Sequence, residues 1–220
     1  MIELDGPALA PRSGAKPKQL VVFLHGYGSN GEDLISLAPY WAPLLPEAEF
    51  LSPNAPFPCE INPFGGYQWF GFEDRSPEML LGGMRLAARI LDAFLDAVLA
   101  GRGLDESALA LVGFSQGTMM GLHVGPRRRQ APAAILGYSG SLVAPELLAA
   151  EKRSDPPILL VHGTADQVVP FAALGEAERA LKAAKIEVMT EARPGLPHSI
   201  DQRGLELGAA FLKRSLAEKA

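Results

Sequence analysis

A serine between two glycines is the first group in this sequence that could do covalent chemistry. It stands in Gly113-Phe114-Ser115-Gln116-Gly117, after the apolar run 109–114 and before a segment with helical periodicity. On a sharp turn from strand to helix, the strained serine needs small residues two positions before and two after it. A glycine-flanked turn without chemistry is the alternative interpretation. As a nucleophile elbow, the turn would expose the Ser115 hydroxyl for acyl transfer, and partner residues must decide between the two.

A serine hydroxyl becomes a nucleophile only with a histidine to take its proton and a carboxylate to orient that histidine. His198 follows the last expected strand, and Asp166 lies in the loop after the strand before it. Ser115, Asp166 and His198 therefore occur in the chain order that α/β hydrolases use. We predict that these three residues form a catalytic triad.

The other histidines and two further acids fit less well. His123 lies inside the expected helix after Ser115, which favours a packing or surface role. His25 and His162 each end an apolar strand as His-Gly but break the required order, so we interpret both as loop-organising residues. Asp155 precedes its strand and Asp201 lies inside the last expected helix, so both are poorer candidates for the acid than Asp166.

Backbone amides should supply the oxyanion hole. The loop at residues 23–33 is rich in glycine, which lets N–H groups approach a bound carbonyl closely. We expect the N–H groups of Tyr27 and Gln116 to be the two donors. The alternative is a glycine-rich loop without a role in catalysis.

Short apolar runs alternate with helical segments along the chain. We expect strands at residues 19–26, 48–53, 109–114, 133–140, 156–163 and 186–192, and helices at 31–45, 76–101, 115–129, 145–152, 170–185 and from about 199 to the end. Such alternation predicts an α/β fold with a mostly parallel sheet covered by helices on both faces. Ligands bind beyond the carboxyl ends of such strands, where the three triad residues fall.

The chain of 220 residues suffices for one domain, 1–220, in which residues 1–19 include a loosely ordered N-terminal segment. Between Ser115 and Asp166 there is no room for a cap domain, which predicts an open, shallow site. The helix at 76–101 begins with Ser76-Pro77, a capping serine followed by a proline suited to the first turn. The role of Gly82-Gly83 inside this helix stays open between close packing and contact with substrate.

Composition excludes several classes of function. The net charge is −5, and the only dense basic run, Arg127–Arg129, is too short to bind nucleic acid, so we expect it at a solvated helix end. Cys59 is the single cysteine, so neither an intramolecular disulfide nor a zinc site is predicted. No leader and no apolar stretch long enough to span a bilayer is recognisable, which favours the cytoplasm without stable membrane insertion.

Four motifs resemble those of the phospholipase/carboxylesterase family of the α/β-hydrolase fold, which includes the acyl-protein thioesterases. They are FLHGYGSNGEDL, GFSQGTMM, HGTADQVVP and GLPHSI. In family members the first loop commonly carries leucine where this chain has Tyr27, a departure that bears on acyl-chain preference. The resemblance implies a nucleophile, an acid, a base, two oxyanion donors and two pocket-lining residues, which fall on Ser115, Asp166, His198, Tyr27, Gln116, Trp69 and Phe70.

The expected function is that of a serine carboxylesterase acting on a small-molecule ester of short to medium chain, with no metal or organic cofactor. The only aromatic concentration lies between Asn54 and Phe72, and some of its rings should line an acyl groove. An acyl-protein thioesterase or lysophospholipase is the nearest alternative, and a non-catalytic α/β-hydrolase binding scaffold is an alternative of another class. Apolar rings near Trp69 would allow a homodimer, but the sequence does not decide the oligomeric state. The aromatic residues of that segment are Phe57, Phe64, Tyr67, Trp69, Phe70 and Phe72.

Overall fold

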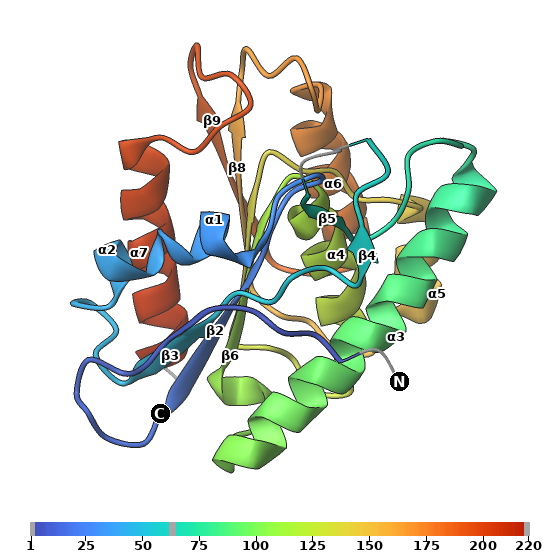
Figure 1. Ribbon diagram of the computed structural model, residues 1–220. Helices are drawn as coiled ribbons and strands as arrows, with labels where there is room; N and C mark the ends of the chain where they lie inside the picture. The colour runs from blue at the N-terminus through green and yellow to red at the C-terminus, as the bar shows by residue number, and fades with distance from the viewer. Residues whose placement is uncertain (1–2, 62–64, 218–220) are drawn as a thin grey trace.

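The computed structural model describes residues 3–61 and 65–217, in which a seven-stranded sheet forms the centre (Figure 1). The strand order is β1-β3-β2-β6-β7-β8-β9, and every neighbouring pair is parallel except β1 with β3. The strands are β1 Ala8–Leu9, β2 Gln19–Leu24, β3 Ala48–Leu51, β6 Leu109–Phe114, β7 Ala134–Tyr138, β8 Ile158–Gly163 and β9 Val188–Arg193.

Helices cover both faces of this sheet (Figure 1). On one face lie α1 Gly31–Ile35, α2 Ala38–Trp41 and α7 Gln202–Ala217; on the other lie α3 Pro77–Arg102, α4 Gln116–Val124, α5 Pro145–Glu151 and α6 Ala172–Ala183. Two 3-10 turns, Glu106–Ala108 and Gly125–Arg127, precede β6 and follow α4. A separate hairpin pairs β4 Phe57–Pro58 with β5 Tyr67–Gln68. The described residues include no cap domain.

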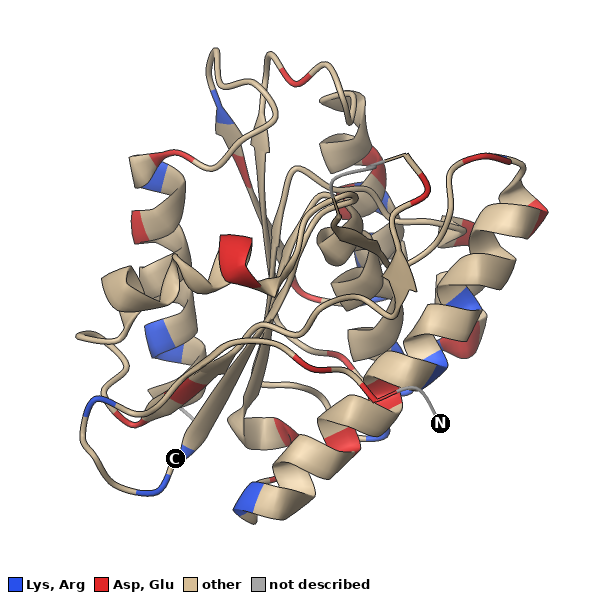
Figure 2. Cartoon of the chain, viewed as in Figure 1, with Lys and Arg blue, Asp and Glu red and all other residues tan. Residues whose placement is uncertain are grey.

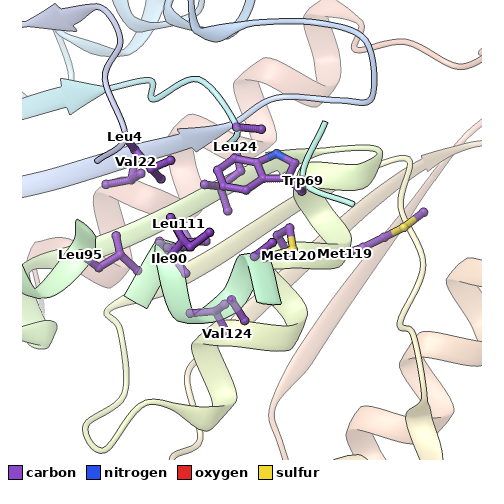
Figure 3. Packing of buried hydrophobic residues seen from close by; sticks show 14 of the residues in the cluster. Leu4, Val22, Leu24, Trp69, Ile90, Leu95, Leu111, Met119, Met120 and Val124 are labelled. Atoms are coloured by element: carbon purple, nitrogen blue, oxygen red, sulfur yellow. The ribbon is translucent and has the colours of Figure 1, made fainter. Parts of the chain in front are cut away.

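The two faces of β2 show why these apolar runs form strands. Val21 and Phe23 pack with Trp41 in the cluster under α2 and α7. Val22 and Leu24 point to the opposite cluster under α3 and α4, where Figure 3 shows them beside other buried side chains. A strand with helices on both sides must be apolar along its whole length. Each buried aliphatic side chain contributes about 2 kcal/mol to folding.

The expected α/β fold with a mostly parallel sheet is confirmed, and the differences from prediction lie at its margins. The single helix expected at 31–45 is two short helices, α1 and α2. Pro39 explains the break, because its nitrogen has no hydrogen to donate to the carbonyl of Ile35. The short strands β1, β4 and β5 were not predicted.

The N-terminal segment, for which the sequence suggested loose order, pairs with the edge of the sheet. β1 aligns Ala8 with Leu51 of β3, the amide of Ser52 donates to the carbonyl of Pro7, and Leu4 is buried. These backbone bonds cover the outer edge of β3, which would otherwise present unpaired groups.

Charged side chains lie mainly on the helices and loops, and the central strands carry none (Figure 2). The prediction that the Arg127–Arg129 run is solvated is wrong for Arg128, whose side chain is only 4% exposed. Its guanidinium group lies 2.9 Å from Asp92, 2.6 Å from Asp96 and 3.2 Å from Glu106. A buried arginine is tolerated because carboxylates surround it.

Candidate active site

Ser115 occupies a strained turn between β6 and α4. Its backbone angles are φ 54° and ψ −115°, a region that a residue with a side chain rarely adopts. A Cβ atom on Gly113 would lie 2.4 Å from the amide nitrogen of Thr118, and one on Gly117 would lie 1.8 Å from the carbonyl oxygen of Leu24. Because these neighbours are backbone atoms, only glycine fits at either position. The flanking glycines are therefore a steric requirement of the turn.

Asp166 and His198 meet across two loops. The Nδ1 atom of His198 lies 2.7 Å from Oδ2 of Asp166, while Oδ1 of Asp166 accepts hydrogen bonds of 2.9 Å from the amides of Val168 and Val169. Burial alone would raise the pKa of Asp166, but the bonds from His198 and the two amides outweigh it and hold that pKa below its ordinary value. Asp166 is therefore a carboxylate at neutral pH, and it fixes the proton of His198 on Nδ1.

Phe114, the residue before Ser115 in the chain, contacts His198. The ring of Phe114 lies against the imidazole of His198 with a centroid separation of 4.8 Å and an angle of 46° between the ring planes. No hydrogen bond joins Ser115 Oγ to His198 within residues 3–61 and 65–217, and such catalytic bonds often tighten only when substrate binds. The side chain of Asp166 is fully buried, whereas that of His198 is 18% exposed. His198 is therefore more open to water than Asp166.

Backbone and side-chain bonds tie the acid loop to the base loop. Thr164 accepts a 2.8 Å hydrogen bond from the amide of Gly195, and the amide of Ala165 donates to the carbonyl of Leu196. At the far end of the base loop, the guanidinium group of Arg193 lies 3.1 Å from Oδ2 of Asp201. The sequence analysis missed Thr164, although it lies in the motif HGTADQVVP two residues before Asp166, and it missed Arg193, which lies outside the four motifs.

Asp201, the poorer candidate for the acid, was expected inside the last helix but lies outside it. It lies just before α7 rather than inside it, and its Oδ1 accepts a 2.7 Å bond from the amide of Gly204 in the first turn. Its bond to Arg193 closes the loop that carries His198. Asp201 therefore caps a helix and closes a loop.

The two expected oxyanion donors are Tyr27, in the loop after β2, and Gln116, directly after Ser115. A Cβ atom on Gly26 would lie 3.5 Å from Cβ of Ser115, so the backbone that leads into Tyr27 passes directly beside the serine. Gln116 is the first residue of α4. Neither amide donates a hydrogen bond within the described part of the chain. Both N–H groups are thus available to a developing negative charge.

The side chain of Gln116 has a separate task. It is fully buried, its Oε1 accepts a 2.9 Å bond from the amide of Trp69, and its Nε2 donates a 2.7 Å bond to the carbonyl of Phe70. The indole of Trp69 donates to the carbonyl of His25, which attaches the same segment to the end of β2. Gln116 therefore fixes residues 69–70 beside the elbow through side-chain bonds, independently of its own amide.

Trp69 and Phe70, the expected pocket-lining residues, are 0% and 2% exposed and belong to the core cluster under α3 and α4. Figure 3 shows Trp69 among these buried side chains. Gly83 of α3 packs against Phe70, since a Cβ atom there would lie 3.0 Å from that of Phe70. Of the two roles left open for Gly82-Gly83, Gly83 thus has the packing role. Contact of the two rings with substrate stays a prediction. Phe64, expected in the same aromatic segment, lies outside the described residues.

The remaining histidines hold loops or fill the core. Nε2 of His25 accepts from the amide of Ala55, so its proton lies on Nδ1, which donates to the carbonyl of Gly26; burial lowers the pKa of His25. Nε2 of His162 lies 3.0 Å from the carbonyl of Val169 and 3.3 Å from Asp166, beneath the acid. These contacts agree with loop-organising roles. Burial, followed by the charge of nearby Arg127, lowers the pKa of His123 to about 4, as suits a packing residue.

Among residues 3–61 and 65–217, no three or more histidine, cysteine, aspartate or glutamate side chains gather as a metal ion would require. The groups described above are the hydroxyl of Ser115, the imidazole of His198, the carboxylate of Asp166 and the amides of Tyr27 and Gln116. That set of groups is suited to acyl transfer through a serine.

Comparison with known proteins shows the family to which the chain belongs. The sequence pattern of the Phospholipase/Carboxylesterase family matches residues 10–216. The chain belongs to that family. Membership supports hydrolysis of esters as the class of reaction and a small-molecule ester as the substrate. Within the described residues no helix is both long enough and apolar enough to span a bilayer.

Individual members of the family show how close the similarity is. The chain is 44% identical to esterase PE8, whose crystal structure superposes with a TM-score of 0.92 over 97% of this chain and 99% of that one. It is 28% identical to Esterase YpfH of Escherichia coli over 93% of this chain and 87% of the relative. It is 34% identical to Acyl-protein thioesterase 1 of Schizosaccharomyces pombe over 68% of this chain and 69% of the relative.

Proposed function

We propose that this chain is a serine carboxylesterase that hydrolyses short- to medium-chain esters through Ser115, His198 and Asp166. The observation that carries the proposal is the 2.7 Å hydrogen bond between His198 and Asp166, in the loops that follow β9 and β8. Because Nδ1 of His198 is committed to the carboxylate, Nε2 is the nitrogen that can take the proton of Ser115.

The reaction proceeds through an acyl-enzyme. Ser115 Oγ attacks the ester carbonyl while His198 accepts its proton, and the alcohol leaves with that proton. His198 then takes a proton from water, the resulting hydroxide attacks the acyl-enzyme, and the carboxylic acid is released as the proton returns to Ser115. The N–H groups of Tyr27 and Gln116 donate to the oxyanion in both tetrahedral intermediates. Asp166 stays ionised and stabilises the imidazolium.

A site without a cap favours esters of limited length, because little protein surface is available to enclose a long acyl chain. The segment with Trp69 and Phe70 would then form the floor beneath the acyl group. Initial rates with p-nitrophenyl esters from acetate to palmitate test this, with Ser115→Ala as the blank. We expect kcat/KM to peak at or below medium chains. A maximum at palmitate would contradict the proposed chain length.

Thioester or lysophospholipid hydrolysis is the second candidate, favoured by the 34% identity to a protein named Acyl-protein thioesterase 1. The same triad could attack a thioester, whose leaving group departs more easily. Assays with an S-acyl peptide and with a lysophospholipid, at matched acyl length, distinguish the candidates. A non-catalytic scaffold would hydrolyse none of these substrates above the Ser115→Ala blank.

A further inference from the structure

The loop that carries the proposed oxyanion donor Tyr27 is attached to the hairpin β4–β5 by backbone bonds. The amide of Gly28 donates to the carbonyl of Tyr67, and the amide of Tyr67 donates to the carbonyl of Ser29. These bonds hold the far side of the loop, beyond Tyr27. The carbonyl of Gly26, which belongs to the same peptide group as the Tyr27 N–H, accepts from Nδ1 of His25 and from the amide of Ser29. The side chain of Tyr27 adds a further bond to these backbone bonds.

The side chain of Tyr27 ends on Glu60, which follows β4. The hydroxyl of Tyr27 donates a 2.7 Å hydrogen bond to Oε1 of Glu60. The same oxygen accepts a 2.8 Å bond from the amide of Phe72, and Oε2 accepts a 3.1 Å bond from the side chain of Gln68. One carboxylate thus joins the oxyanion loop to both ends of the segment that contains Trp69 and Phe70.

Aromatic contacts reinforce this junction. The ring of Tyr27 lies 5.0 Å from that of Phe72, which in turn lies 5.4 Å from the ring of Phe70. The amide of Phe72 and the hydroxyl of Tyr27 lower the pKa of Glu60, so the carboxylate is ionised at neutral pH. Burial, and then the bond to Glu60, raises the pKa of Tyr27, whose hydroxyl keeps its proton.

Glu60 is an exposed residue, although its carboxylate accepts three hydrogen bonds. An exposed acid adds little to the free energy of folding, and its bonds here converge on the loop beside Ser115 instead of on the core. A hydrogen bond to a charged acceptor is short and directional, which suits it to fixing a backbone position.

We propose that Glu60 is a positioning residue for ester hydrolysis: by holding the Tyr27 hydroxyl, it keeps the Tyr27 N–H aimed at the oxyanion. The inference rests on the proposed function, in which that N–H is an oxyanion donor. The tyrosine hydroxyl supplies a link that a side chain without a hydrogen-bond donor could not make. The link acts on the transition state, in which the oxyanion carries its charge, more than on the bound ester.

Tyr27→Phe and Glu60→Gln test the link from its two ends. Tyr27→Phe keeps the ring against Phe72 and removes only the hydroxyl. We expect kcat for p-nitrophenyl acetate to fall about tenfold in each variant, since a misplaced donor loses part of what a deleted one loses. KM should change by less than about twofold. The double variant should be no slower than the slower single variant, because Tyr27→Phe removes the same bond that Glu60→Gln weakens by taking away the charge of its acceptor.

Two matched controls remove the same groups from other side chains. Tyr40→Phe deletes the hydroxyl of an exposed tyrosine in α2, and Glu73→Gln neutralises an exposed acid beside Phe72; neither side chain donates or accepts a hydrogen bond in the described part of the chain. Both should keep kcat within about twofold of the unmodified chain. Thermal melting of all variants checks folding.

Inhibition by phenylboronic acid separates positioning from loss of structure. Its adduct with serine is tetrahedral and places an oxygen in the oxyanion hole, so its inhibition constant should rise in proportion to the loss of kcat. If kcat and this constant stay within about twofold in both Tyr27→Phe and Glu60→Gln, the positioning role is wrong. Near-normal turnover by Ser115→Ala would instead overturn the proposed function, and this inference with it.

Discussion

Two neighbouring strands of the sheet, β6 and β7, end in the same way, yet of the two only β6 leads directly into a helix. β6 finishes with Gly113-Phe114-Ser115 and β7 with Gly137-Tyr138-Ser139, and the glycines and aromatic residues are paired in register. The serines have similar backbones, with φ 54° and φ 48°, and both are buried. Their amides even donate to the next strand in the same manner, Ser115 to Tyr138 and Ser139 to Val161.

The chain beyond each serine differs. Ser115 leads directly into α4, whose first amides are free to bind an anion, and the backbone at Gly26 lies against its side chain. Ser139 leads into Gly140, and the next helix, α5, starts only at Pro145. The hydroxyl of Ser139 has no hydrogen-bond partner in the described residues. We propose that a strained, buried serine is insufficient for reaction and that the helix directly after Ser115 makes the difference.

Replacing the two serines gives the largest expected contrast. Ser115→Ala should lower kcat for p-nitrophenyl acetate by at least about 10⁴-fold without changing the fold, because it removes the attacking oxygen. Steady-state rates, with circular dichroism as the control, measure this. Near-normal turnover in Ser115→Ala would break the comparison.

Asp166 allows a second test of the comparison between β6 and β7. It follows β8, which pairs with β7 and not with β6, so it lies nearer in the sheet to the strand that ends in Ser139. Asp166→Asn should lower kcat by about 10³- to 10⁴-fold, because the asparagine no longer fixes the proton of His198 on Nδ1. Asp201→Asn is the matched control and should lower kcat by no more than about threefold. Equal losses in the two variants would contradict the assignment of Asp166 as the acid.

The glycines before the two serines should differ in what they tolerate. A Cβ atom on Gly113 meets backbone atoms, whereas one on Gly137 meets the side chains of Thr118, at 2.5 Å, and Leu160, at 2.9 Å. Side chains can move more easily than backbone. We expect Gly113→Ala to lower the free energy of unfolding by about 3 kcal/mol and Gly137→Ala by about 1 kcal/mol. Urea denaturation followed by fluorescence measures both, and the reverse order would show that β6 is not the more tightly constrained strand.

The smallest effect is expected at Ser139. Because its hydroxyl makes no hydrogen bond in the described part of the chain, Ser139→Ala should leave kcat within about threefold of the unmodified protein. The variant is to be assayed beside Ser115→Ala under the same conditions. A loss that approaches that of Ser115→Ala would assign Ser139 a direct part in the reaction.

Local patterns in the sequence predicted the strands and the turn at Ser115, because these depend on residues that lie close together in the chain. The apolar run at 109–114 is β6 to the residue, and the glycines around Ser115 are required by its turn. The order of Asp166 and His198 along the chain predicted that they meet, and they are hydrogen-bonded; their catalytic roles remain predictions.

Contacts between distant segments could not be read from those patterns. Arg128 is buried because Asp92 and Asp96, more than 30 positions earlier, lie on the face of α3 that it meets. Trp69 and Phe70 are covered by α3 and bonded to Gln116, which lies 47 and 46 positions away from them. Ser76 stands at the start of α3, as predicted, but its side chain makes no capping bond. The sequence suggested a solvated Arg128 and a capping side chain at Ser76, and the structure differs at both places.

Covalent labelling with a fluorophosphonate tests the central claim, that Ser115 is the nucleophile, most directly. The probe reacts with a serine only when a base and an oxyanion hole activate it. Intact-protein mass spectrometry should show one adduct, and peptide mapping should place it on Ser115, with Ser139 unmodified and the Ser115→Ala variant unlabelled. An adduct on Ser139, or labelling of Ser115→Ala at the rate of the unmodified protein, would contradict the account.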